Sequence, residues 1–252
     1  MMKYSLCIEP VLPDMEPLDR IAVAAEIGYD AVEFWNPARI DAEEAVRRAA
    51  RCGIEVSACC AFQHRRDHLA SDRAVPSITR SIEELGGLGI RRVILMSGDV
   101  HARVDDQRLI LVENLKRLRD AAEKHGVCLL LEPLNSYVDH KGYYLDSSYV
   151  AFEIARIVDS PNVKVLYDVY HMQIMEGNIL DTIAGNLSRI GHIHLAGVPN
   201  RHEPSLGELD IRRVLRQLEA LGYNGYVGME YWPLDNTRDG LLREFQTVTG
   251  GR

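Results

Sequence analysis

The stretch "VCLLLEPLN", Val127 to Asn135, is a run of leucines that ends in the glutamate Glu132. An apolar run without alternation is typical of a strand that is buried on both faces, as in a parallel sheet covered by helices. A carboxylate at the end of such a strand is costly unless another charge compensates it. The stretch therefore predicts a parallel sheet and a partner for Glu132.

Apolar runs of this kind recur along the whole chain, about eight in all, at intervals of roughly 24 to 36 residues, the length of one strand and one helix. They cover residues 4–10, 31–35, 55–62, 91–98, 127–134, 163–171, 190–197 and 225–232. Between them, apolar residues recur at three- and four-residue spacing, for example in residues 41–53, 105–126 and 207–222, which indicates helices. Strands and helices are thus expected to alternate.

Capping residues agree with these boundaries. Asp41 and either Ser147 or Ser148 are predicted helix N-caps. Glycines that end helical runs are expected in the left-handed conformation, namely Gly28, Gly53, Gly89, Gly126 and Gly222. No linker divides the 252 residues, and no GxGxxG follows the first strand. The pattern predicts one domain, residues 1–252, folded as a closed (β/α)8 TIM barrel.

Composition excludes several classes of protein. The net charge of -8 and the pI near 5.6 give no basic footprint for nucleic acid. Five cysteines without CxxC spacing argue against a disulfide framework and a structural zinc site. The chain shows neither a signal-peptide pattern nor an apolar run of membrane-spanning length. We therefore expect a cytoplasmic enzyme with no nucleic-acid or membrane partner.

Four consecutive predicted strands end in potential metal ligands: Glu132, Asp168, His194 and Glu230. The carboxyl ends of barrel strands meet at one rim, where active sites lie. Three carboxylates and a neutral imidazole brought together there need a cation. Their oxygen-rich donor set favours one Mn²⁺ or Mg²⁺ ion, with Co²⁺ tolerated.

Each of these residues also has an ordinary structural interpretation. Glu132 could be a simple strand-end carboxylate, Asp168 a helix or turn cap, and Glu230 the partner of a surface arginine. Any one of them alone would leave the two interpretations about equal. Four in equivalent positions favour a metal site.

Further candidates lie near the same rim. His171 could reach a substrate oxygen or be a loop residue bonded to backbone, and Arg201 could hold a carboxylate or hydroxyls or be a surface arginine. His192 shares strand parity with His194, so both point to the same side, but we expect His192 to be a packed layer residue.

Other polar and aromatic residues are weaker candidates. Glu9 and Glu33 end the first two predicted strands, and either could contact substrate. His140 and Lys141 could line the rim or lie in a solvated loop. The two tryptophans, Trp35 and Trp232, are expected to form walls of a pocket or part of the core.

Four motifs carry a resemblance to a known family. They are "LLLEPLN" (129–135), "VLYDVYHMQIMEGN" (165–178), "IGHIHLAGVPNRHEP" (190–204) and "YVGMEYWP" (226–233). Together they resemble the hydroxypyruvate isomerase group of the xylose-isomerase-like, AP endonuclease 2 type TIM barrels. The resemblance covers about residues 127–233, and the first half of the chain matches mainly in its succession of strands and helices.

The resemblance implies roles for individual residues. Glu132, Asp168, His194 and Glu230 would bind the divalent metal, and the two glutamates would also act as acid and base. His171 and Arg201 would contact a small hydroxy-keto substrate. The implied reaction is the isomerisation of hydroxypyruvate to tartronate semialdehyde through an enediolate, by a homodimer or homotetramer.

Two departures keep alternatives open. Ketose 3-epimerases usually carry a further glutamate six residues past the first ligand, where this chain has Val138. The segment "FQHRRDHLASD" (62–72) lacks the glycine-containing loop expected of hydroxypyruvate isomerases. The alternatives are a ketose 3-epimerase or aldose-ketose isomerase for another small sugar, a keto-sugar-acid dehydratase, an endonuclease IV-like phosphodiesterase, and a non-enzymatic sugar-acid binding barrel.

Overall fold

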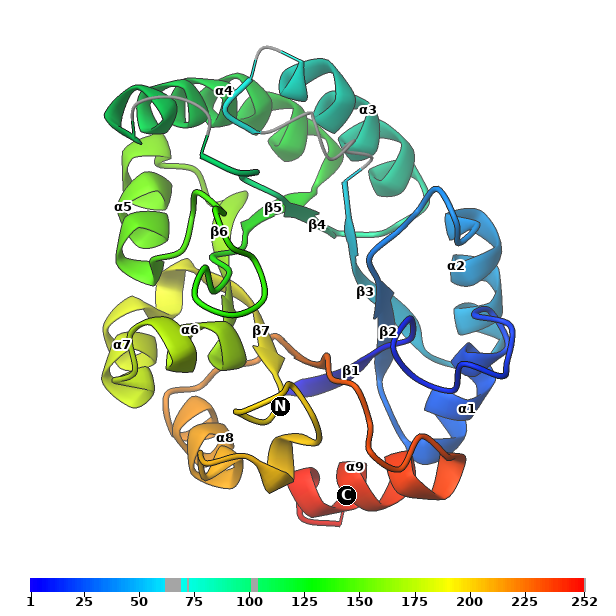
Figure 1. Cartoon of the computed structure of the whole chain (residues 1–252). Helices are drawn as coiled ribbons and strands as arrows, with labels where there is room; N and C mark the ends of the chain where they lie inside the picture. The colour runs from blue at the N-terminus through cyan, green and yellow to red at the C-terminus, as the bar shows by residue number, and fades with distance from the viewer. Residues whose placement is uncertain (62–68, 72, 101–103, 252) are drawn as a thin grey trace.

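The computed structural model describes residues 1–61, 69–71, 73–100 and 104–251. Its strands are parallel and form a closed barrel in sequence order, with β8 paired back to β1 (Figure 1). The strands are β1 Lys3–Cys7, β2 Ala31–Phe34, β3 Glu55–Cys60, β4 Arg92–Leu95, β5 Cys128–Leu131, β6 Val163–Asp168, β7 Ile190–Leu195 and β8 Tyr226–Met229. The predicted (β/α)8 barrel is confirmed.

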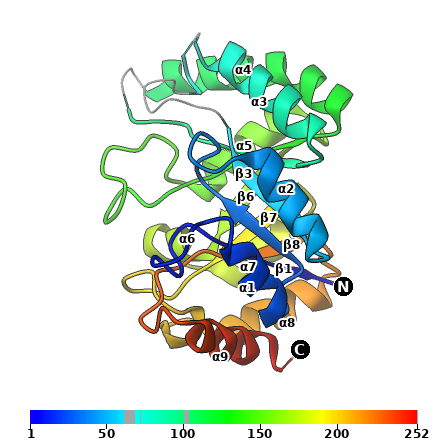
Figure 2. The same cartoon turned by 90° about the vertical axis from the view of Figure 1, so that its right-hand side faces the viewer.

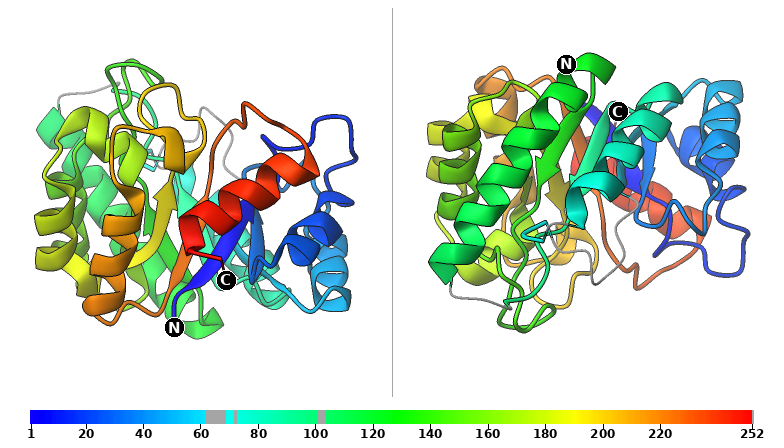
Figure 3. Two further views of the ribbon diagram at one scale, coloured as in Figure 1. Left: turned by 90° about the horizontal axis from the view of Figure 1, so that it is seen from below. Right: turned by 90° about the horizontal axis from the view of Figure 1, so that it is seen from above.

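Helices surround the strands on the outside (Figures 1 and 2). They are α1 Arg20–Ile27, α2 Ala42–Arg51, α3 Ala74–Gly87, α4 Val104–His125, α5 Ser148–Val158, α6 Val169–Met175, α7 Ile179–Asn186, α8 Ile211–Ala220 and α9 Arg238–Thr249. Helix α9, red in Figure 3, lies beside the blue β1 and α1. Its Phe245 ring packs 5.9 Å from that of Tyr4 and 4.5 Å from that of Tyr29, which ties the end of the chain to its beginning.

The predicted helix boundaries are confirmed. Asp41 caps α2 by accepting a hydrogen bond from the backbone N–H of Glu44 at 3.0 Å. Ser147 caps α5 through Val150 in the same way. Left-handed backbone, with positive φ, occurs at every predicted terminating glycine: Gly28, Gly53, Gly89, Gly126 and Gly222. Among the described residues, no helix combines the length and apolar character needed to span a membrane.

We expect Asp41→Ala to lower the free energy of unfolding by about 1 kcal/mol, because the first turn of α2 loses its capping acceptor. Chemical denaturation monitored by circular dichroism measures this. Arg47→Ala, on the same helix, is the control: Arg47 is 60% exposed, and its ion pairs are surface pairs that stabilise little. Equal stability of the two variants would contradict the capping role.

The predicted end of the sixth strand at Asp168 is confirmed, and helix α6 begins at the next residue. The Asp168 carboxylate accepts hydrogen bonds from the backbone N–H groups of Tyr170 and His171, at 2.7 and 3.2 Å. Asp168 therefore caps a helix, and His171 lies in its first turn rather than in a loop.

The inside of the barrel has an apolar and a polar half. A separate apolar cluster comes from β3 to β6 and consists of Ala58, Ile94, Leu130 and Leu166. Opposite it, buried polar side chains come from β1, β2, β3 and β7: Ser5, Glu33, Ser57, His192 and His194. Within this polar half, His194 lies near the carboxyl end of its strand.

Candidate metal centre and active site

The four predicted ligands converge at the carboxyl end of the barrel. Glu132 and Glu230 directly follow β5 and β8, Asp168 ends β6, and His194 lies in β7. Each offers one ligand atom, and these atoms all lie within 4.8 Å of one another. All four side chains are buried. The structure thus brings together the set that strand order predicted.

The ring of His194 faces carboxylates on both sides. Its Nδ1 lies 3.1 Å from Oε2 of Glu230 and 3.5 Å from Oε1 of Glu132. Its Nε2 lies 2.9 Å from Oε1 of Glu33. Neither ring nitrogen is aligned for a hydrogen bond with any described residue. Because Nδ1 is the nitrogen next to Glu132 and Glu230, it is the one that His194 offers to the cluster.

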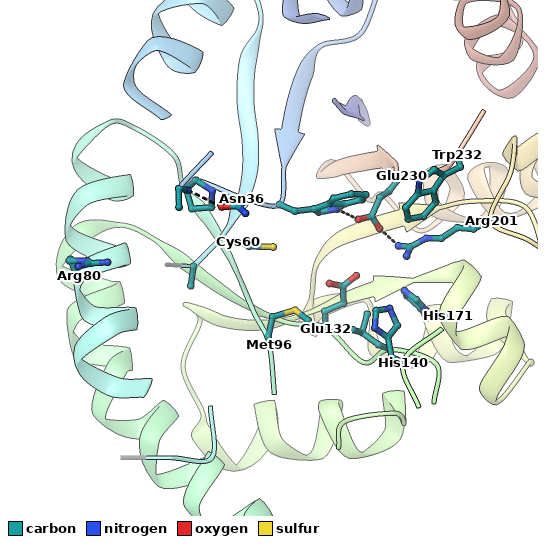
Figure 4. A pocket seen from close by; sticks show the side chains of 15 residues that line it. Asn36, Cys60, Arg80, Met96, Glu132, His140, His171, Arg201, Glu230 and Trp232 are labelled. Carbon is teal, nitrogen blue, oxygen red and sulfur yellow. Dashed lines mark hydrogen bonds and ion pairs between the residues drawn. The ribbon is translucent and has the colours of Figure 1, made fainter. Parts of the chain in front are cut away.

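Glu230 is held by donors on both of its oxygens. Trp35 donates its indole N–H to Oε1, and Nη2 of Arg201 contacts Oε2 (Figure 4). The same Nη2 lies 3.4 Å from Oδ2 of Asp168. The Arg201 guanidinium also lies over the rings of Tyr170 and Trp232, at 5.3 and 5.2 Å. With φ of 59°, Arg201 has a left-handed backbone that is rare for its residue type and concentrated at functional sites.

The pKa values of the cluster indicate that its buried carboxylates need a positive charge nearby. Burial raises the pKa of the Glu132 carboxyl to about 7. Burial opposes ionisation of Glu230 too, but Arg201 and His194 outweigh it and hold its pKa at about 2. Although burial disfavours a charged His194, Glu230 and Glu33 raise its pKa well above the usual value. Without a cation, the cluster takes up protons instead.

A divalent cation fits this donor set. Two ligand atoms of the cluster are buried without a hydrogen-bond partner among the described residues: Oε1 of Glu132 and Nδ1 of His194. Both face the other ligand groups, where a cation would bind. Three carboxylates and one imidazole match the ligands that Mn²⁺ and Mg²⁺ take in proteins. A cysteine thiol among the ligands would favour zinc. The four described groups of the cluster include no cysteine.

We expect cation affinity to fall as pH falls, because Glu132 must be ionised in order to bind. With a pKa of about 7, Glu132 alone makes Mn²⁺ binding about tenfold weaker at pH 6 than at pH 8. The proton that His194 must lose makes the dependence steeper. Titration calorimetry at both pH values measures the change, and affinity that stays constant between them would contradict it.

The hydrogen bonds of His171 fix its tautomer. The backbone N–H of Asn135 donates to Nδ1 at 3.2 Å, so the hydrogen of a neutral ring must be on Nε2. Burial, with the positive charge of Arg201 nearby, lowers the pKa of His171 well below its usual value and keeps the ring neutral. Nε2 lies 3.5 Å from Oδ2 of Asp168. His171 is therefore a fixed hydrogen-bond donor beside the cluster.

A cavity of about 620 Å³ lies above the cluster. Both glutamates line it together with His171 and Arg201, whereas Asp168 and His194 are absent from its wall. In Figure 4, Glu132, His140 and His171 lie below Glu230 and Arg201. The predicted walls Trp35 and Trp232 line it too, with ring centroids 5.5 Å apart. The carboxyl-end rim thus carries a pocket with acid-base, donor and cationic groups.

Other sequence candidates lie elsewhere. Glu33 is buried inside the barrel, hydrogen-bonded to His192 at 2.9 Å, and is not among the residues that line the cavity. Glu9 accepts from the backbone N–H groups of Trp35 and Asn36 and is also absent from the cavity wall. His140 lines the cavity, but Lys141 does not.

Sequence reasoning missed several residues of the site. Asn36, Cys60, Met96 and Leu134 line the cavity, and Asn135 orients His171. Strand parity was the available signal for Cys60, which lies in β3 two residues beyond Ala58 of the interior cluster. Most of segment 62–72, whose sequence departs from the expected loop, lies outside the described residues.

Comparisons with known proteins agree with this geometry. The family model described as xylose isomerase-like TIM barrel matches residues 21–245. A 2-oxo-tetronate isomerase of Cupriavidus necator is 36% identical, covering 89% of this chain and 90% of that protein. A hydroxypyruvate isomerase of Escherichia coli is 30% identical, covering 96% and 97%. A solved structure named AP endonuclease, family 2, from Brucella melitensis has a TM-score of 0.82 at 28% identity, covering 96% of this chain and 97% of that one.

Proposed function

The chain belongs to the xylose isomerase-like TIM barrel family, and from that premise we propose that it is an enzyme that isomerises a small hydroxy-keto acid with the help of one divalent cation. The observation that carries the proposal is the convergence of Glu132, Asp168, His194 and Glu230 beneath a cavity. The relatives named 2-oxo-tetronate isomerase and hydroxypyruvate isomerase, each matched over most of its length, support the substrate class.

The four residues would hold Mn²⁺ or Mg²⁺, with Co²⁺ tolerated, through three carboxylates and Nδ1 of His194. Such a cation polarises a bound carbonyl and acidifies the neighbouring C–H group. Because the donor groups are preassembled and buried, little rearrangement is needed at the moment of reaction.

Proton transfer is assigned to Glu132 and Glu230, both of which line the cavity. One glutamate removes the proton from the hydroxyl-bearing carbon, giving an enediolate. The hydroxyl proton passes to the former carbonyl oxygen, and a proton then returns to the former carbonyl carbon. Glu132, with its pKa of about 7, is suited to exchange a proton near neutral pH. General acid-base transfer contributes about 10² to 10⁴ in rate.

Two further side chains would position the substrate. Nε2–H of His171 is a donor of fixed direction, because Asn135 occupies Nδ1. Arg201 presents a guanidinium that suits the carboxylate of a keto acid. Its Nε has no hydrogen-bond partner among the described residues, which leaves a donor for a bound anion. The paired rings of Trp35 and Trp232 would keep water from the reacting carbons.

The preferred reaction is hydroxypyruvate to tartronate semialdehyde, with 2-oxo-tetronate as the next keto acid to examine. Val138, where epimerases usually carry a substrate-binding glutamate, is 60% exposed and absent from the cavity wall, which supports a keto acid over a ketose. A 3-epimerase, an aldose-ketose isomerase and a dehydratase differ from this only in what the enediolate does next.

A substrate panel tests the proposal. Protein loaded with Mn²⁺ is incubated with hydroxypyruvate, 2-oxo-tetronate and short ketoses, and the products are identified by nuclear magnetic resonance. We expect the two keto acids to be interconverted with their isomers and the ketoses to react more slowly. Faster epimerisation of a ketose at C3 would favour the epimerase, and no turnover across the panel would contradict the proposal.

The Brucella structure named for an AP endonuclease family raises a different activity. A nucleic-acid substrate is disfavoured by the net charge of -8, since phosphate backbones are bound by basic surfaces. The described carboxyl-end cluster has a single histidine among its four groups. Metal content separates the two functions: about one ion per chain supports the isomerase, and a multi-metal cluster would support the endonuclease.

A further inference from the structure

Glu33 is a buried carboxylate that the proposed chemistry does not use. It lies in β2, but its side chain reaches His192 and His194 of β7. Oε2 accepts a hydrogen bond from Nε2 of His192 at 2.9 Å and another from Oγ of Ser57 at 3.1 Å. The carboxylate of Glu33 thus lies inside the barrel, beside the cluster.

The second oxygen of Glu33 faces the metal ligand. Oε1 lies 2.9 Å from Nε2 of His194, while Nδ1 of the same ring faces Glu132 and Glu230. In metal sites, a carboxylate that accepts from the free ring nitrogen of a histidine ligand fixes both the tautomer and the orientation of the ring. Glu33 is the carboxylate that lies beside this nitrogen of His194.

Gly228 provides the space for this arrangement. It lies in β8, beside His194 in the parallel register. A Cβ atom at residue 228 would clash with Oε1 of Glu33 and would lie 2.9 Å from its Cδ and 2.7 Å from Cδ2 of His194. Any side chain at this position therefore displaces the Glu33 carboxylate or the His194 ring.

Glu33, His192 and His194 could themselves be read as a second cation site, since their ligand atoms also lie close together. The separations argue otherwise. Oε2 of Glu33 already accepts hydrogen bonds from His192 at 2.9 Å and from Ser57 at 3.1 Å, while Oε1 contacts Nε2 of His194 at 2.9 Å. Two hydrogen-bond donors thus already occupy one oxygen of the carboxylate.

We propose that Glu33 is a positioning residue of the metal centre: its carboxylate holds the His194 ring with Nδ1 toward the ligand carboxylates, in space that Gly228 leaves free. The proposal rests on the proposed function, because it concerns the same metal centre. Loss of such an outer carboxylate typically weakens metal affinity by about 10 to 100-fold.

The test is calorimetric titration of Mn²⁺ into metal-free protein. Glu33→Gln removes the charge and one acceptor, whereas Gly228→Ala keeps the charge and displaces the carboxylate. We expect both to bind Mn²⁺ about 10 to 100-fold more weakly than the wild type. Excess Mn²⁺ should then restore turnover in both. If Glu33→Gln binds more weakly and Gly228→Ala binds normally, charge rather than position is responsible, and the proposal is overturned.

Matched controls separate this from general damage. Glu244→Gln changes another buried carboxylate, one that accepts hydrogen bonds from Ser205 at 2.5 and 2.8 Å. Gly185→Ala adds a methyl group in helix α7, where no described heavy atom lies within 4 Å apart from the neighbouring residues and backbone of the same helix. Both controls should bind Mn²⁺ like the wild type. Equal affinity in all the variants overturns the positioning role, whereas a wild type that binds no cation overturns the proposed function itself.

The wild-type protein provides a second measurement, which does not depend on the Glu33 and Gly228 variants. In the Mg²⁺-loaded protein, ¹H–¹⁵N correlations of the His194 ring, assigned by their loss in His194→Asn, report which nitrogen carries the hydrogen. We expect it on Nε2, facing Glu33. A hydrogen on Nδ1 would overturn the proposal.

Discussion

Glu230→Gln is expected to remain folded and to turn over substrate about 10² to 10⁴ times more slowly than the wild type at saturating Mn²⁺. The amide keeps the size of the side chain and an oxygen for Trp35 or Arg201, but it cannot accept or return a proton. Initial rates with the best substrate of the panel measure the loss. Saturating the protein with Mn²⁺ separates the loss of proton transfer from weaker metal binding.

Glu219→Gln is the control for that experiment. Glu219 lies on the exposed face of α8 and has no part in the cavity wall. Its variant should have wild-type rates. If Glu230→Gln retained more than about a tenth of wild-type turnover, well above what loss of acid-base transfer allows, Glu230 would not be an acid-base group.

Metal removal should have the other large effect. Dialysis against a chelator is expected to reduce turnover to the rate of the uncatalysed reaction, because three buried carboxylates then lack their cation and Glu132 takes up a proton near pH 7. Returning Mn²⁺ should restore the rate at about one ion per chain. Metal content and turnover are measured on the same samples.

The cation should also stabilise the fold, since it binds the native arrangement of ligands and not the unfolded chain. At a free concentration 100-fold above its Kd, the expected gain is about 2.7 kcal/mol in the free energy of unfolding. Thermal melts with and without Mn²⁺ measure it. Full turnover in protein freed of metal would show that the carboxylates work without a cation.

Much of the fold could be predicted from short-range patterns. Uninterrupted apolar runs, helical spacing and terminating glycines are local properties, and they located the strands and most helices. Glu132, Asp168, His194 and Glu230 could also be predicted to meet, because parallel barrel strands bring their carboxyl ends to one rim. Only their role as metal ligands is still a proposal.

Other parts of the site depend on contacts that no local pattern contains. Glu33 and His192 are 159 residues apart, and their pairing becomes visible only once β2 and β7 face each other across the barrel interior. Gly228 reads as an ordinary strand glycine until the Glu33 carboxylate is seen to occupy its side-chain space. The position of His171 in a helix rather than a loop was not evident, because α6 follows β6 without an intervening loop.

The central claim is that buried carboxylates at a cation move a proton between neighbouring carbons. Its most direct test is turnover in heavy water, followed by mass spectrometry and nuclear magnetic resonance of the product. We predict rapid incorporation of solvent deuterium at the former carbonyl carbon with Mn²⁺-loaded wild type, incorporation about 10² to 10⁴ times slower with Glu230→Gln, and none above the uncatalysed rate with metal-stripped protein. A product formed at the full rate without solvent deuterium would mean that the migrating hydrogen never exchanges with solvent, and it would contradict transfer through an exchangeable carboxyl group.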